Sequence, residues 1–173
     1  MKDHALKSGV ILGVVGILIS LTTYIIDPLL MIKWWFSLFS LVLFISLVSY
    51  FGVQYRKILG GFVSFKIGYI YSMITFVLAG LIGTAFNILL FHVIDPDLPQ
   101  LISEAIIEQT VEMMEGFGAN QEIIDQAIED ADTPATFTVI GQIKSFGMVL
   151  IFYTLMSLIS GAIIKRKVPE FSE

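Results

Sequence analysis

Four long apolar runs without a charged residue constrain this chain more than any other feature. They extend over residues 9–26, 34–53, 67–94 and 145–164, and none contains Asp, Glu, Lys, Arg or Pro. A helix of about 20 apolar residues crosses the roughly 30 Å hydrocarbon core of a bilayer. Only 14% of all residues are charged and 56% are apolar, which is too little charge for the surface of a soluble domain. The sequence predicts an all-α integral membrane protein, a single domain over residues 1–173 with four transmembrane helices.

The first run has one alternative interpretation, because Lys2 and Lys7 precede it as basic residues precede the core of a signal peptide. The apolar core of a signal peptide usually has about 7–15 residues and is followed by an A-x-A cleavage site. Residues 9–26 are longer than that and no such site follows. We therefore expect this run to be retained as a membrane span.

The basic residues predict an orientation. Eight of the ten lie in the N-terminal tail, in the 54–66 loop and in the C-terminal tail. Short cytoplasmic loops carry an excess of Lys and Arg, so both termini are expected in the cytoplasm of a bacterial cell, with the protein in its inner membrane. Trp34 and Trp35 would then lie at the outer interface and Tyr50 and Tyr55 near the inner one, as aromatic belts require.

An acidic segment separates the third and fourth runs. Residues 95–132 hold 11 of the 15 acidic residues, and no basic residue occurs between positions 67 and 143. Apolar residues at three- and four-residue spacing predict helices here, the first beginning near Asp95–Pro99 and ending at Gly116 and Gly118. Asn120 is a candidate N-cap for the next helix. A further start at Thr133 and Pro134 is expected to continue unbroken through the fourth span, which makes residues 95–138 a helical extracytoplasmic insert.

Acidic residues recur at helical spacing within this insert and have two explanations. One is a solvated face opposite each apolar stripe. The other is a weak Ca²⁺ or Mg²⁺ site or a docking surface for a basic protein partner, because oxygen ligands suit hard cations. No spacing matches an EF-hand loop, so the signal for a cation site is weak, and the sequence does not identify a metal. The candidate ligands are Glu104, Glu108, Glu112, Asp125, Glu129 and Asp132.

Small residues within the spans are candidates for helix packing. Close approach of small faces drives the association of helices in lipid. Packing within the bundle is the first interpretation, and contact in a homo-oligomer is the alternative. The candidate packing positions are Gly9, Gly13, Gly80, Gly83 and the deepest strongly polar residue, Asn87. For Asn87 we expect an interhelical hydrogen bond, and a substrate contact is the other interpretation.

Three short motifs resemble a known family. They are the run Gly60–Lys66 before the third span, the exit Ile94-Asp95-Pro96 into the acidic segment, and the tail from Gly161 with its basic residues 165–167. Together they resemble the four-helix membrane proteins catalogued as domain of unknown function 4199, common in Bacteroidota. The resemblance implies an inner-membrane protein with an external helical insert between its last two spans. It implies no catalytic residue, ligand or partner.

Catalytic machinery is missing from the sequence. It contains no Cys and only two His, and it has no H-E-x-x-H, G-x-S-x-G or phosphate-binding Gly-rich loop. We expect no enzyme, no cofactor and no nucleic-acid binding, with the lipid bilayer as the main partner. The first functional hypothesis is a membrane scaffold or accessory protein whose acidic insert contacts a partner or cations. The alternative is a small carrier or channel for an uncharged or weakly polar solute, lined by Ser, Thr and Asn87.

Overall fold

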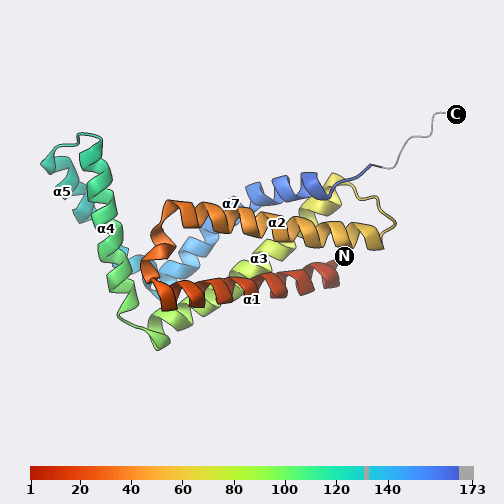
Figure 1. Ribbon diagram of the computed structural model, residues 1–173, viewed down its shortest axis with the longest axis horizontal. Coiled ribbons are helices and arrows are strands. Elements are labelled where there is room, and N and C mark those ends of the chain that lie inside the picture. The colour runs from red at the N-terminus through yellow and green to blue at the C-terminus, as the bar shows by residue number, and fades with distance from the viewer. Residues whose placement is uncertain (131–132, 168–173) are drawn as a thin grey trace.

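Four long helices form the body of the protein. The computed structural model describes residues 1–130 and 133–167. The long helices are α1 (Lys2–Ile26), α2 (Trp34–Ile58), α3 (Phe65–Leu89) and α7 (Val139–Ile164), and all four are long and apolar enough to span a membrane. They run along the length of the molecule, and the shorter helices gather at one end (Figure 1). The predicted all-helical membrane class is confirmed.

The two ends of the bundle differ in charge. We call the basic end the one with Lys2, Lys7, Arg56, Lys57, Lys66, Lys165, Arg166 and Lys167, at which α1 begins and α7 ends. We call the acidic end the opposite one, where α4 (Leu98–Gly116) and α5 (Gln121–Asp130) lie. Arg56 and Val63 tie the basic end together: Arg56 Nη1 donates to Ile164 O at 2.9 Å, and Val63 pairs with Arg166 through two backbone hydrogen bonds.

Helix α3 is the centre of the bundle. It runs parallel to α1. Near the start of α1 Thr75 Oγ1 donates to Ala5 O at 3.3 Å, and near the end of α1 Tyr24 Oη donates to Oδ2 of Asp95, which follows the third span, at 3.2 Å. It runs antiparallel to α7, and there Gly68 and Gly161 bring the two backbones together. The small residues that the sequence offers thus allow α3 to contact two neighbours at short range.

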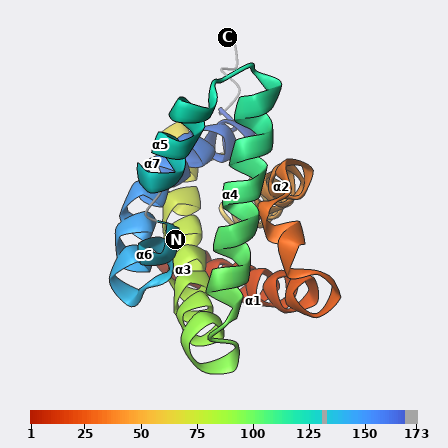
Figure 2. The ribbon, with the colours of Figure 1, turned by 90° about the vertical axis from the view of Figure 1, so that its left-hand side faces the viewer.

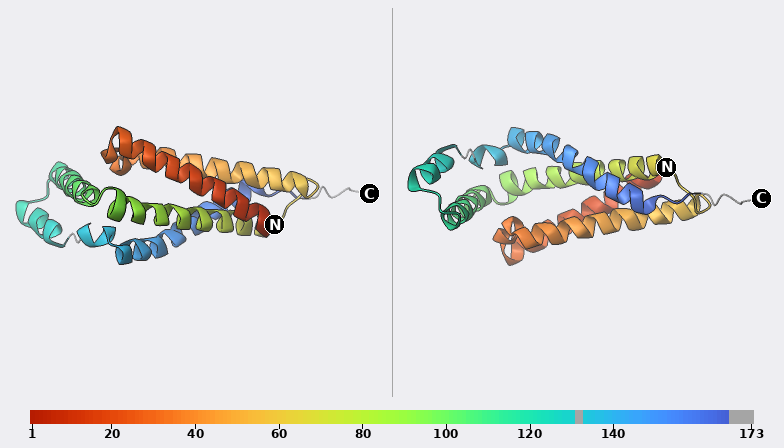
Figure 3. Two further views of the ribbon diagram at one scale, coloured as in Figure 1. Left: turned by 90° about the horizontal axis from the view of Figure 1, so that it is seen from below. Right: turned by 90° about the horizontal axis from the view of Figure 1, so that it is seen from above.

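Helix α2 is the peripheral helix. Its half near the basic end packs into the core, where Val48 is completely buried with Leu12 and Phe76. Its other half is exposed, for example at Trp34 (72%) and Phe39 (55%). Both views of Figure 3 show α2 and α7 close together at the basic end and diverging toward the acidic end. A space between the helices therefore opens in the acidic half of the bundle.

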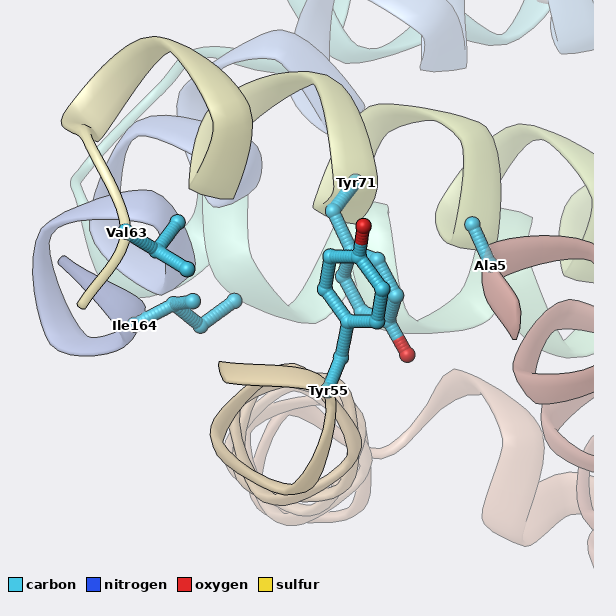
Figure 4. Packing of buried hydrophobic residues seen from close by; sticks show 5 residues of the cluster. All are labelled: Ala5, Tyr55, Val63, Tyr71 and Ile164. Carbon is cyan, nitrogen blue, oxygen red and sulfur yellow. The ribbon is translucent and has the colours of Figure 1, made fainter. Parts of the chain in front are cut away.

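An aromatic cluster joins α2 to the other helices at the basic end (Figure 4). The rings of Tyr55 from α2 and Tyr71 from α3 are stacked, with centroids 5.2 Å apart. Tyr71 is fully buried, and its hydroxyl lies 2.7 Å from Ser8 Oγ and 3.0 Å from His4 Nδ1 of α1. One side chain thus connects three helices.

The helix ends follow the local signals in the sequence. Gly118 has a positive φ of 78° and ends α4 in a Schellman motif, with Ala119 N donating to Met114 O at 3.0 Å. Asn120 Oδ1 accepts from Ile123 N at 3.0 Å, so the predicted N-cap of α5 is confirmed. The third span extends beyond α3 through a π-helical turn, η2 (Leu90–Ile94), and a 3₁₀ helix, η1 (Pro28–Ile32), links α1 to α2.

The prediction of one unbroken helix from Thr133 through the fourth span is wrong. Helix α6 (Thr133–Phe137) has only five residues, and α7 starts anew after Thr138. Thr138 is extended, with φ −63° and ψ 158°, and its hydroxyl accepts from Gly141 N at 3.0 Å. A threonine that caps the next turn in this way interrupts a helix.

Helix α4 lies across the acidic end, transverse to the long helices (Figure 1). Seen from that end, it passes between α2 on one side and α3, α6 and α7 on the other (Figure 2). Its buried residues Leu98 and Ile102 form a cluster with Leu90 and Phe91 of η2, and Phe137 of α6 packs against this cluster. The apolar stripe of α4 therefore closes over the end of the bundle.

Candidate functional site

The space between the diverging helices is a cavity of about 970 Å³. Its volume lies at the upper end of the range of about 300–1,000 Å³ that small-molecule sites occupy. Every long helix contributes a stripe of residues at helical spacing. The stripe of α3, for example, includes Phe76, Gly80, Gly83 and Asn87, and Phe91 of η2 continues it.

The lining changes in polarity along the bundle. Deep in the bundle, near its middle, it is formed by apolar residues such as Leu12, Phe76 and Met156. Toward the acidic end hydroxyl and carboxamide groups enter the lining. These polar groups belong to Ser20, Thr23, Ser37, Ser40, Thr84, Asn87, Thr136, Gln142 and Ser145. One further hydroxyl, that of Tyr153, lies deeper in the cavity, beside Gly80. Among the residues that the structure describes, no Asp, Glu, Lys or Arg lines the cavity. Such a lining suits a molecule without charge, because an unpaired charge in an apolar site costs far more than an uncharged polar group.

Asn87 is the strongest hydrogen-bonding group in the α3 stripe. Its side chain is half-buried and lines the cavity. The expected interhelical hydrogen bond is not found: in the described part of the chain, no hydrogen bond involves the Asn87 carboxamide. Gln142, by contrast, uses its Nε2 to donate to Phe137 O at 3.3 Å. Asn87 therefore presents two donors and one acceptor oxygen with no partner among the described residues.

The opening of the cavity lies on the side of α2 and α7. The lining residues that are exposed are Trp34, Ser37, Leu38, Thr136, Val149 and Phe152. All of them belong to α2, α6 and α7, whereas the lining residues of α1 and α3 are buried or half-buried. At the acidic end the cluster beneath α4 covers the bundle. The cavity thus opens sideways, between two of the helices that would face lipid.

The glycines proposed for packing divide into two groups. A methyl group on Gly9 would lie 3.0 Å from Leu78 Cβ, one on Gly13 would lie 2.8 Å from Ile82 Cβ, and one on Gly80 would meet the ring of Tyr153. These three glycines allow contact between helices. Gly83 differs, because a methyl group there would meet nothing within 4 Å. It lines the cavity and is not a packing position.

The acidic candidates lie on the exposed sides of α4 and α5. Glu104, Glu108, Glu112, Asp125 and Glu129 are all exposed, and Asp132 lies outside the described residues. Glu104 accepts from Gln100 at 2.9 Å and Asp125 from Gln121 at 3.1 Å, each within its own helix. Over residues 1–130 and 133–167, no group of three or more His, Asp or Glu side chains is arranged to hold a metal ion.

The sequence predicts Asn87 as a site residue but does not identify the other individual residues of the cavity lining. The serines of α2 and the threonines of α1 and α3 give no distinctive signal, because such residues often bond to the backbone of their own helix in membranes. Their spacing of three or four residues was the one available indication of a shared face.

Comparison with known proteins identifies a family and no closer relative. No curated protein and no solved structure matches the chain. One family model, described as protein of unknown function (DUF4199), matches residues 7–166. This match includes α1 from Lys7 onward, all of α2, α3 and α7, the acidic helices and the whole described cavity lining, and the chain belongs to this family.

Proposed function

We propose that this protein is a non-enzymatic, multi-pass membrane protein that binds an uncharged, largely apolar small molecule in the cavity between its helices. The observation that carries the proposal is the cavity of about 970 Å³ between α1, α2, α3 and α7, whose described lining residues include no charged side chain. A bundle in lipid gains stability from close packing of its helices. A cavity of this size removes packing contacts between the helices. A bound molecule would replace those contacts, which supports a role in binding.

A second function is supported by the acidic hairpin of α4 and α5. Phe117, in the turn after α4, is 86% exposed. Seven carboxylates of the two helices are exposed as well: Glu104, Glu108, Glu112, Glu115, Glu122, Asp125 and Glu129. This combination favours contact of the hairpin with a basic protein partner, as an accessory or scaffold protein would make. The two functions are compatible, because the hairpin lies at the acidic end and the cavity opens between α2 and α7.

The cavity can be tested by filling it. In Gly83→Trp the indole has open space at the cavity wall, so we expect the variant to fold but to lose its ligand. The probe is a long-chain alcohol with a photoactivatable diazirine, applied to purified protein in liposomes. Wild type should be labelled saturably on residues of the lining, and labelling of Gly83→Trp should fall to the unsaturable background.

Gly147→Trp is the matched control, because Gly147 also has nothing within 4 Å but does not line the cavity. It should be labelled like wild type. Absence of saturable labelling in wild type would overturn the binding proposal and leave the accessory function as the better one. Equal labelling of Gly83→Trp and wild type would show that the probe binds elsewhere.

We also propose that the basic end is cytoplasmic and that α4 and α5 lie outside the inner membrane. The charge asymmetry of the two ends supports this orientation. The sequence has no Cys, so a single introduced cysteine is the only thiol that a maleimide can label in this chain. A membrane-impermeant maleimide should label Gly116→Cys, at the end of α4, in intact cells, and it should label Lys57→Cys, at the end of α2, only after permeabilisation. The reverse pattern would refute the orientation.

A further inference from the structure

We infer that the ligand of the cavity is an amphiphile from the bilayer with an uncharged, hydrogen-bonding head group, held with its head at Asn87 and its chain toward the middle of the bundle. This inference rests on the proposed binding function and specifies its ligand. The occupant is one apolar chain with a hydroxyl, ester or amide head, of the kind that neutral lipids carry.

The direction of the ligand follows from the polarity of the lining. Apart from the Tyr153 hydroxyl beside Gly80, the polar side chains of the cavity lie toward the acidic end, and the end of the cavity near Leu12, Phe76 and Met156 is lined mainly by apolar side chains. A chain with one polar end satisfies both regions only when its head lies toward the acidic end. The reverse orientation would bury a polar head among apolar side chains without hydrogen bonds, at a cost in free energy.

The chemistry of the head follows from the charges and from Asn87. A phosphate or carboxylate head would need a cationic partner, and no Lys or Arg lines the cavity. Lys33 and Lys144, the basic residues outside the basic end, are exposed and are not part of the lining. The Asn87 carboxamide can donate to and accept from one head group at the same time, and it has no hydrogen bond among the described residues.

Access from the bilayer follows from the position of the opening. The exposed part of the lining lies on α2, α6 and α7, and Trp34 stands at its edge, 72% exposed. Tryptophan prefers the membrane interface, the level at which lipid head groups lie. At the acidic end, Leu98 and Ile102 of α4 are buried against Phe91 and cover the part of the bundle beside η2. A lipid can therefore pass sideways between α2 and α7 with its head at the level of Trp34.

Three diazirine probes with the same chain test the inference in liposomes. One is a monoacylglycerol, one is a lysophosphatidic acid and one is an alkane without a head group. For wild type we expect the monoacylglycerol to label the cavity at the lowest concentration. Asn87→Leu should weaken monoacylglycerol labelling about threefold to tenfold, the value of one neutral hydrogen bond, and should leave alkane labelling unchanged. Asn87→Gln should recover part of the loss, because it keeps the carboxamide.

Thr22→Val is the control for loss of a polar group, since the Thr22 hydroxyl donates to Leu18 O on the exposed side of α1, away from the cavity. Its labelling should match wild type. If the alkane and the monoacylglycerol label wild type equally and Asn87→Leu changes neither, the head-group assignment is wrong while the cavity still binds. Tighter labelling by lysophosphatidic acid would overturn the uncharged head. If none of the probes labels saturably, the binding function itself fails.

Discussion

Replacing Gly161 with leucine is expected to destabilise the bundle by forcing α3 and α7 apart. A side chain at Gly161 would place its Cβ 2.9 Å from Tyr69 N and 3.0 Å from Tyr69 Cα. These are backbone atoms of α3, which cannot rotate away as a side chain can. Helices α3 and α7 would have to separate, and α3 is the helix that also holds α1. Overpacking of this kind costs about 1–3 kcal/mol or more.

The measurement is thermal unfolding of purified protein in a mild detergent, followed by circular dichroism. We expect the midpoint for Gly161→Leu to fall by on the order of 10 °C. Gly147→Leu, on the same helix, is the control, because a side chain there has open space. If both variants unfold at the temperature of wild type, the close approach of α3 and α7 is wrong, and with it the central position of α3.

Replacing Tyr71 with alanine is expected to detach α2 at the basic end. The tyrosine is fully buried, stacks on Tyr55 of α2, and bonds to Ser8 and His4 of α1. Truncation of a large buried aromatic side chain costs about 3–5 kcal/mol. Tyr71→Phe keeps the stack and loses only the hydroxyl, so it should cost about 1 kcal/mol.

The unfolding midpoint in detergent again measures both variants. Tyr50→Ala is the control, because Tyr50 belongs to α2 but is 58% exposed. We expect the midpoints to fall in the order Tyr50→Ala, Tyr71→Phe, Tyr71→Ala, with the last the least stable. A Tyr71→Ala protein as stable as Tyr50→Ala would show that the aromatic cluster does not hold α2 in place. A Tyr71→Phe protein as unstable as Tyr71→Ala would assign the stability to the hydroxyl instead of the ring.

The spans and most helix ends could be predicted from the sequence because they depend on local chemistry. A charge-free apolar run of about 20 residues has few alternatives to a membrane helix, since every backbone group in lipid must be bonded internally. The cap at Asn120 and the turn at Gly118 likewise involve partners within five residues. The start of α7 was the exception. Thr133 and Pro134 signal a helix start but do not show that Thr138 will cap a second one five residues later.

The roles of the spanning residues were decided by the tertiary structure. Gly80 and Gly83 are the same residue type on the same helix, and the sequence assigned both to packing. Gly80 contacts Tyr153, whereas Gly83 lies where α2 and α7 have moved apart and so lines the cavity. Asn87 stands one turn further along the same stripe and lacks a hydrogen bond among the described residues for the same reason.

The sequence by itself thus determined that this protein has four helices long and apolar enough to span a membrane, which end of its bundle is basic and where its acidic helices lie, because composition along the chain decides these features. Only the tertiary structure decided that α3 is central, that α2 is held at one end, and that a cavity opens between α2 and α7. These features depend on the crossing angles between helices that are far apart in the chain. A small change of crossing angle decides whether two helices are still in contact a few turns further along or have an open space between them. No local pattern of residues encodes that difference.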